Sequence, residues 1–290
     1  QEEWEFKMFR SALHKVLNDL HEQHDSIFVE LVEELLDRVA LFGSHFASID
    51  IRQDSREIKR AFDAVAHQLG LKVPTTPEEL FDLDAKWDGT LTDDDRVDDT
   101  LQSFQVIREI QAKNGPKGAH RYIISNCRGA MDVARVFALA RWTAFGDEKI
   151  SVDIVPLFET IDDLMGAGAS MNTLYSESNY RRHLTQRGNK QTIMLGFSDG
   201  TKDGGYMSAN WNIYRAKENL TRISKLNDID VVFFDGRGGP PARGGGNTHN
   251  FYASLGRQIA SSEIQLTVQG QTISSNFGTS ESAQFNMEQL

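Results

Sequence analysis

The sequence predicts an α/β fold, specifically part of a β/α (TIM-like) barrel with extensive additional helices. Short apolar runs alternate with helical stretches along most of the chain, which is typical of a parallel sheet covered by helices. No dinucleotide-binding glycine fingerprint accompanies the predicted strands, which favours a barrel over an open sheet. Polar residues directly follow the predicted strands, and in a barrel such residues share one face.

The first segment of the chain is helical by its pattern. Apolar side chains recur at helical spacing from Trp4 to Leu20 and again from Leu31 to Val39, which predicts one or two helices within residues 2–42. We expect a helical segment at 1–42 and the partial barrel at 43–290, with a single domain overall.

The rest of the chain alternates between strands and helices. The apolar runs that predict strands lie at 46–51, 121–125, 151–158, 191–197, 229–234 and 263–268. The stretches that predict helices lie at 55–69, 100–113, 129–145, 160–174, 204–226 and 248–260. Residues 72–99 contain Pro74, Pro77 and an acidic run, which predicts a solvated surface excursion between two units.

Composition narrows the class of protein. A formal net charge of -11 argues against a general binder of nucleic acid or anionic membranes, since these attract basic surfaces. The single cysteine, Cys127, cannot form an internal disulfide, which favours a reducing compartment. We see no signal peptide and no apolar span of membrane length, and we expect a cytoplasmic protein. The chain starts at Gln1 rather than methionine and stops in a polar run, so we expect a piece of a longer protein.

Polar residues gather just after the predicted strands. They are Asp50 and Arg52, Ser125, Glu159, Asp199 with Lys202, and then Asp235, Arg237 and Arg243. The carboxyl ends of barrel strands open onto one face, where active sites of this fold are built. Residues that are distant in sequence are therefore expected to meet in one pocket, which is the strongest argument from the residues for an enzyme.

Two of these residues suggest a metal site. Glu159 and Asp199 are carboxylates at the ends of different predicted strands, and a small set of hard oxygen ligands suits Mg²⁺ or Mn²⁺. The alternative is that acids at strand ends cap the following helix. Thr160, Asp162 and Asp163 could cap in this way.

The glycine-rich run 236–246, GRGGPPARGGG, predicts an anion site. Glycines such as Gly238 and Gly239 let backbone amides approach an anion closely, and Arg237 and Arg243 supply planar forks for phosphate or carboxylate. A flexible linker and an RNA-binding arginine-glycine segment are the alternatives. The position between a strand and a helix disfavours both.

A second glycine-containing segment, GFSDGTKDGG at 196–205, has similar features. Lys202 could neutralise phosphate, and amides near Gly204 and Gly205 would add the positive end of a helix. The lysine does not follow a glycine at the spacing of a P-loop, so the segment is not one.

Three long blocks resemble signature segments of phosphoenolpyruvate carboxylases, in the family's order. They are VPLFETIDDL (155–164), GFSDGTKDGGYMSANW (196–211) and FFDGRGGPPARGGGNTH (233–249). SIDIRQDS (48–55), RYIISNC (121–127) and VQGQTI (268–273) are similar to further segments. The resemblance covers about residues 40–278.

The resemblance implies a largely helical carbon-carbon lyase built on an eight-stranded barrel, usually a homotetramer. It implies carboxylation of phosphoenolpyruvate by bicarbonate to oxaloacetate and phosphate, through carboxyphosphate and the enolate of pyruvate. The implied metal ligands are Glu159 and Asp199, for Mg²⁺ or Mn²⁺. The implied catalytic residues are Arg237, Arg243, Lys202 and Asp235, and the implied substrate-binding residues are Arg52, Arg237, Arg243, Gly238 and Gly239.

The sequence also departs from the family's pattern. Asp235 stands where the family usually has histidine, and Val268 and Gln271 replace common glutamates. The family's N-terminal block with its essential histidine and its C-terminal arginine-containing part have no counterpart here. We therefore expect the isolated chain to be inactive, or very slow. The changes at Asp235, Val268 and Gln271 also motivate the alternative, a catalytically inactive relative that acts as a binding or scaffold subunit.

Overall fold

The computed structural model describes residues 2–146, 148–236, 248–260, 262–268 and 270–288, except for the side chains of residues 2–5, 199 and 248–249. The chain forms two compact units. The first unit contains Gln1–Ile51 and Gln102–Arg121, and the second contains Arg52–Leu101 and Tyr122–Leu290.

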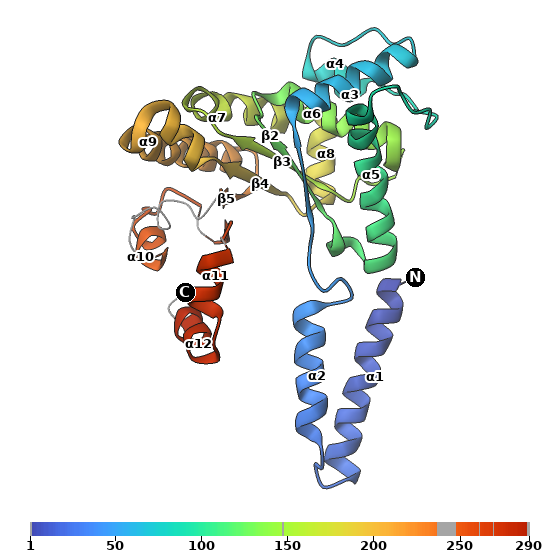
Figure 1. Ribbon diagram of the computed structural model, residues 1–290, viewed down its shortest axis with the longest axis vertical. Coiled ribbons are helices and arrows are strands. Elements are labelled where there is room, and N and C mark those ends of the chain that lie inside the picture. Colours follow the sequence, from blue (N-terminus) through green and yellow to red (C-terminus); the bar gives the residue numbers. More distant parts are fainter. Residues whose placement is uncertain (1, 147, 237–247, 261, 269, 289–290) are drawn as a thin grey trace. The chain divides into compact units, whose positions relative to one another are not determined.

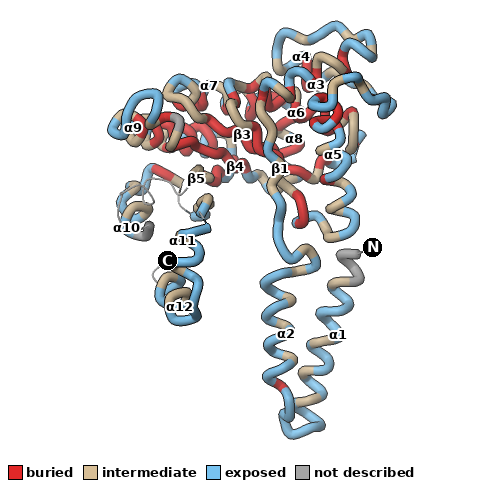
Figure 2. The backbone as a smooth tube through the Cα atoms, in the orientation of Figure 1, coloured by how far each residue is buried: buried red, intermediate tan, exposed pale blue. Residues whose placement is uncertain are grey.

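The first unit contains two long helices that pack against each other, α1 (Glu2–Gln23) and α2 (Val29–Phe42). Most of their residues are exposed, and Figure 2 shows this along both helices. Apolar side chains such as Phe9, Leu31 and Leu41 lie at the surface. The helical spacing of apolar residues in this segment therefore predicted the helices correctly, although it did not lead to a buried core.

The chain forms a six-stranded sheet, and all residues of this sheet except Asp50, Ile51 and Arg121 belong to the second unit. Its strands are β1 (Asp50–Asp54), β2 (Arg121–Ser125), β3 (Asp153–Phe158), β4 (Lys190–Leu195), β5 (Asp230–Asp235) and β6 (Ile264–Leu266). Their order in the sheet is β1-β2-β3-β4-β5-β6, and β3, β4, β5 and β6 pair in parallel. A doubly wound sheet reverses its strand order at a switch point, whereas this sheet adds each strand on the same side. The predicted partial β/α barrel is confirmed.

Helices connect the strands and cover them. Figure 1 shows helices α6, α7, α8 and α9 alongside the sheet. The helices of the chain after α2 are α3 (Ser55–Gln68), α4 (Pro77–Asp82), α5 (Asp95–Asn114), η1 (Pro116–Gly118), α6 (Ala130–Ala140), η2 (Arg141–Phe145), α7 (Ile161–Ser176), α8 (Ser178–Gln186), α9 (Phe197–Leu226), α10 (Thr248–Ala253), α11 (Gly270–Phe277) and α12 (Ser280–Glu288).

The core of the second unit lies in and beside the sheet, where buried residues concentrate (Figure 2). Ile123, Val155, Leu157 and Met194 come from three adjacent strands and form one buried cluster, against which Phe234 packs. These side chains share one face of the sheet because alternate residues of a strand point the same way. Burial of such side chains provides most of the stabilisation of the unit.

The segment at 72–99 differs from its prediction as a solvated excursion. Its helix α4 buries Leu80 and Phe81, and Trp87 farther along is also buried. Thr76 caps α4 by accepting a hydrogen bond from the Glu79 amide at 3.3 Å. The prediction from the two prolines and the acidic run therefore missed a short amphipathic helix, which packs on α6.

None of the helices among the described residues is both long and apolar enough to cross a membrane.

Candidate active site

A cleft of about 370 Å³ opens at the carboxyl ends of the strands. The residues that line it are Arg52, Leu157, Glu159, Met194, Gly196, Phe197, Ser198, Lys202, Gly236 and Thr267. They come from β1, from β3 and the residue after it, from β4, from the start of α9, and from the positions after β5 and β6. Arg52, Glu159 and Lys202, three of the predicted site residues, therefore meet at one cleft.

Glu159 is the one carboxylate among the described side chains that line this cleft. Its Oε2 accepts a hydrogen bond from the backbone amide of Asn126 at 2.7 Å, and its Oε1 accepts one from Arg52 at 3.2 Å. Asn126 has a φ of 52°, the left-handed conformation that asparagine tolerates better than most residues. The turn after β2 therefore holds the Glu159 carboxylate in a fixed orientation.

The residues after Glu159 cap the next helix. The Thr160 side chain accepts a hydrogen bond from the Asp163 amide at 3.1 Å, and the Asp163 carboxylate accepts one from the Thr160 amide at 3.0 Å. This reciprocal pair is a capping box for α7. Thr160 and Asp163 therefore perform the capping role that the sequence left open, and Glu159 contacts Arg52 and Asn126 instead.

The capping assignment leads to a first prediction. Replacing Thr160 by alanine is expected to lower the free energy of unfolding by about 1 kcal/mol, because the Asp163 amide loses its acceptor. Chemical denaturation of both proteins measures this change. Ser170→Ala on the exposed side of α7 is a matched control with little expected effect. Equal stabilities for Thr160→Ala and wild type would contradict the assignment.

The start of α9 brings Lys202 and a helix terminus to the cleft. Gly196 precedes the helix, and a Cβ at this position would lie only 3.0 Å from the Cα of Glu159, so a larger residue would be crowded against Glu159 here. A short helical segment begins at Phe197, ahead of the predicted start at 204, and a kink at Gly205, with a φ of 79°, separates it from the longer helix that follows. The first turn therefore directs the positive end of the helix dipole to the cleft.

Asp235 is not among the residues that line the cleft. Its side chain is buried at the end of β5, where its Oδ2 accepts a hydrogen bond from Lys217 at 2.8 Å. The Tyr252 hydroxyl donates to the same oxygen. Burial and the neighbouring carboxylate raise the pKa of Tyr252 above its ordinary value, which keeps the hydroxyl a donor. Lys217 and Tyr252 were not among the site residues predicted from the sequence. The local signal for Lys217 is its helical spacing from the apolar residues Ile213 and Leu220.

Other predicted site residues lie outside the described part of the chain. They are Arg237, Gly238, Gly239 and Arg243, together with the side chain of Asp199. The backbone of Asp199 belongs to the first turn of α9. Among the described side chains, no group of three or more histidine, cysteine, aspartate or glutamate residues could hold a metal ion.

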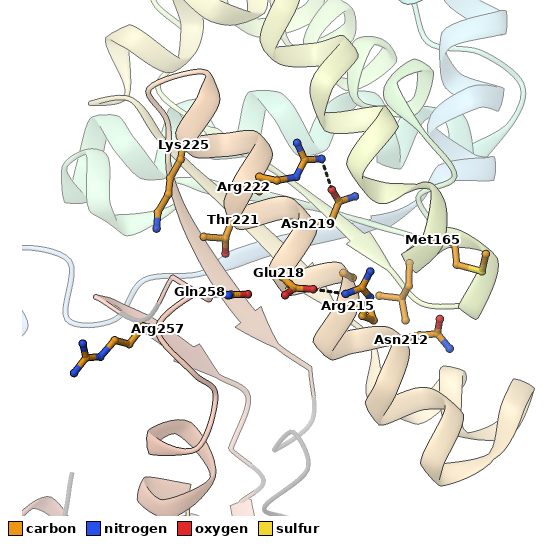
Figure 3. Close-up of a pocket in the computed structure, with 12 residues that line it drawn as sticks. Met165, Asn212, Arg215, Glu218, Asn219, Thr221, Arg222, Lys225, Arg257 and Gln258 are labelled. Carbon is orange, nitrogen blue, oxygen red and sulfur yellow. Dashed lines mark hydrogen bonds and ion pairs between the residues drawn. The ribbon is translucent and has the colours of Figure 1, made fainter.

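A larger cleft, of about 820 Å³, lies along α9 and is drawn in Figure 3. Arg215 pairs with Glu218 at 2.5 Å, and Arg222 donates to the side chain of Asn219 at 2.8 Å. The described residues that line this cleft come from α7, α9 and the segment after α10, and none of these comes from a strand end. Active sites of β/α barrels lie at the strand ends, so the smaller cleft at the strand ends is the better candidate for the active site.

Comparisons with a family model and with curated proteins point to the same family. The sequence model of the family described as phosphoenolpyruvate carboxylase matches residues 4–290. Phosphoenolpyruvate carboxylase of Gloeobacter violaceus is 32% identical over 274 residues, covering 89% of this chain and 29% of the relative. The corresponding protein of Parasynechococcus marenigrum is 32% identical over 97% of this chain and 29% of its own length. That of Xanthomonas euvesicatoria is 35% identical over 89% of this chain and 29% of its own length.

This chain thus spans about 29% of the length of these curated relatives. The match nevertheless runs through nearly all of the chain, from the helices of the first unit to α12. The chain belongs to the phosphoenolpyruvate carboxylase family.

Proposed function

We propose that this chain supplies part of the active site of a phosphoenolpyruvate carboxylase. The parent protein would join phosphoenolpyruvate and bicarbonate to give oxaloacetate and phosphate. The observation that carries the proposal is the convergence of Arg52, Glu159 and Lys202 on one cleft at the strand ends. These residues come from three segments of a chain whose family model matches residues 4–290.

The charges around the cleft suit the first half of this reaction. An oxygen of bicarbonate forms a bond to phosphorus while the bond from phosphorus to the enol oxygen breaks, which yields carboxyphosphate and the enolate of pyruvate. Arg52, Lys202 and the amino end of α9 place positive charge near the transferring group. Positioned cations and helix termini lower the energy of such a transition state.

Apolar residues beside these cations suit the second half. Carboxyphosphate breaks into carbon dioxide and phosphate, and the enolate carbon then forms a bond to carbon dioxide. Leu157 and Met194 line the cleft and belong to the buried cluster of the sheet. An apolar wall limits access of water, which would otherwise protonate the enolate.

A divalent cation fits the donor set. Glu159 offers hard carboxylate oxygens at the cleft, and the backbone of Asp199 lies in the helix turn that borders it. We propose that these two residues would hold Mg²⁺ or Mn²⁺, with water completing the coordination. When bound, the metal would supply Lewis-acid stabilisation of negative charge on oxygen. Arg52, which now donates to Glu159, would then be released toward the anionic substrate.

Binding of Mn²⁺ to this chain tests the proposal. Glu159→Gln and Asp199→Ala are each expected to weaken Mn²⁺ binding by about tenfold or more, because each removes a charged ligand. Asp162→Ala is the matched control, since Asp162 is an exposed acid in the first turn of α7. Isothermal titration calorimetry, with and without the unreactive analogue 2-phospholactate, gives the dissociation constants.

We expect the analogue to strengthen Mn²⁺ binding by the wild type, while steady bicarbonate-dependent formation of oxaloacetate stays absent. Equal affinities for wild type, Glu159→Gln and Asp199→Ala would show that the cleft does not bind the metal. Sustained turnover by the chain alone would contradict the proposal that other segments of the parent complete the site.

A further inference from the structure

Lys217 lies inside the second unit, on α9, and is 2% exposed. Its Nζ donates to Asp235, which is 3% exposed, at 2.8 Å. The ammonium group also lies 5.5 Å from the ring centres of Phe233 and Tyr252, within the range of cation–π contacts. A buried lysine normally requires such compensation, because removing its charge from water is costly.

Backbone hydrogen bonds connect Asp235 and the next residue to the candidate site. The amide of the next residue, Gly236, donates to the carbonyl oxygen of Leu195 at 3.0 Å, and the Asp235 carbonyl accepts from Thr267 at 3.1 Å. Gly236 and Thr267 both line the cleft. The backbone of Asp235 is therefore hydrogen-bonded to a residue that lines the cleft, whereas its carboxylate accepts a hydrogen bond from Lys217.

Among the residues that the structure describes, those packed around Asp235 contribute few charges. Lys217 comes from α9 and Tyr252 from α10, while the sheet neighbours in register, Leu195 and Leu266, are apolar. Among the described side chains, the charged residues that line the cleft itself are Arg52, Glu159 and Lys202. Within this described part of the chain, Lys217 is the cation in contact with Asp235, and the pair as a whole carries no net charge.

We propose that Lys217 is a positioning residue of the candidate site, which neutralises Asp235 so that this acid does not repel the anions that enter the cleft. The inference rests on the proposed function, because that function makes the ligands anionic. It also removes a reason to regard the chain as an inactive scaffold. An aspartate at the end of β5 is compatible with phosphate binding when a buried lysine cancels its charge.

The test compares Lys217→Met, Asp235→Asn and the double variant, with Lys225→Met as a control for loss of an exposed lysine from α9. Thermal unfolding measures the pairing without any ligand. Each single variant leaves one buried charge without its partner and is expected to unfold roughly 10 °C below the wild type. The double variant is expected to recover most of this loss.

Phosphate binding, followed by calorimetry, separates electrostatics from simple loss of structure. At pH 8 we expect Lys217→Met to bind phosphate roughly tenfold more weakly than wild type, and Asp235→Asn to bind it more tightly. The two variants thus change affinity in opposite directions although both lose stability. The deficit of Lys217→Met relative to wild type should be absent in the double variant.

Weaker phosphate binding by both single variants, or a double variant as unstable as Lys217→Met, would overturn the inference. If the wild type bound no phosphate, the proposed function would fail, and the claim that Lys217 tunes anion binding would fail with it. The unfolding cycle would still establish whether the two residues form a coupled pair. If Lys217→Met did not fold, tighter binding by Asp235→Asn and wild-type binding by the double variant would still support the inference.

Discussion

Replacing Phe81 by alanine is expected to lower the free energy of unfolding by about 3–5 kcal/mol. Phe81 is fully buried, and its ring centre lies 5.0 Å from that of Phe137 and 5.6 Å from that of Tyr180. Truncation removes the transfer free energy of the ring and leaves a cavity between α4, α6 and α8. The truncation also removes the edge-to-face attraction between the rings of Phe81 and Phe137.

Urea denaturation followed by circular dichroism measures the loss. Leu91→Ala is the matched control, since Leu91 belongs to the same segment between α4 and α5 but is 55% exposed, and its truncation should change stability by less than about 0.5 kcal/mol. A Phe81→Ala protein as stable as the Leu91→Ala protein would mean that α4 does not belong to the core.

Acidification is expected to destabilise the second unit through His183. Burial, reinforced by the nearby Arg187, lowers the pKa of His183 from 6.5 to about 4. Between these two values the unfolded chain binds a proton that the folded chain excludes. The contribution of His183 to stability is therefore complete above pH 6.5 and falls by up to roughly 3 kcal/mol as the pH drops to 4.

Unfolding free energies at pH 7.5 and pH 4.5 test this effect. Carboxylates also titrate in this range, so the informative quantity is the difference in pH dependence between wild type and His183→Gln. We expect the variant to lose less stability on acidification, whereas His67→Gln, at an exposed position of α3, should behave as the wild type does. An unchanged pH dependence in His183→Gln would show that the imidazole is protonated without cost.

Apolar runs predicted the strands well where the strands are apolar. Residues 121–125 were predicted as a strand and form β2 with the same bounds. The first strand was predicted at 46–51 but lies at Asp50–Asp54, because its residues Arg52 and Gln53 are polar. A strand that presents polar side chains to a site lacks the alternation on which the prediction depends.

Helices were harder to place where glycine or polar residues interrupt the pattern. The prediction started the helix at residue 204, the first of its glycine pair, and missed only the short helical segment that begins at Phe197 and is separated from the longer helix by a kink at Gly205. Helix α8 was not predicted at all, since its segment SNYRRHLTQ is mostly polar. It forms because Tyr180, His183 and Leu184 are buried on one face, and this tertiary packing is invisible in composition.

The general location of the site could be predicted, but its contacts could not. Arg52 and Glu159 are 107 residues apart, and the rule that parallel strands end at one face was enough to bring them together. That Glu159 accepts from the Asn126 amide, or that Asp235 pairs with Lys217, depends on the paths of particular turns and helices. Side-chain pairing between elements leaves no periodic trace in the sequence.

The strand order has a consequence for synthesis of the protein. Each strand pairs with the strand before it in the chain, and β3, β4 and β5 begin at residues 153, 190 and 230. A ribosome that adds about 5–20 residues per second would deliver a new strand roughly every 2–8 s. The sheet can therefore grow during translation, with the most recent apolar strand always as its open edge. Chaperones would be needed most in those few seconds, before the next strand emerges and pairs with that edge.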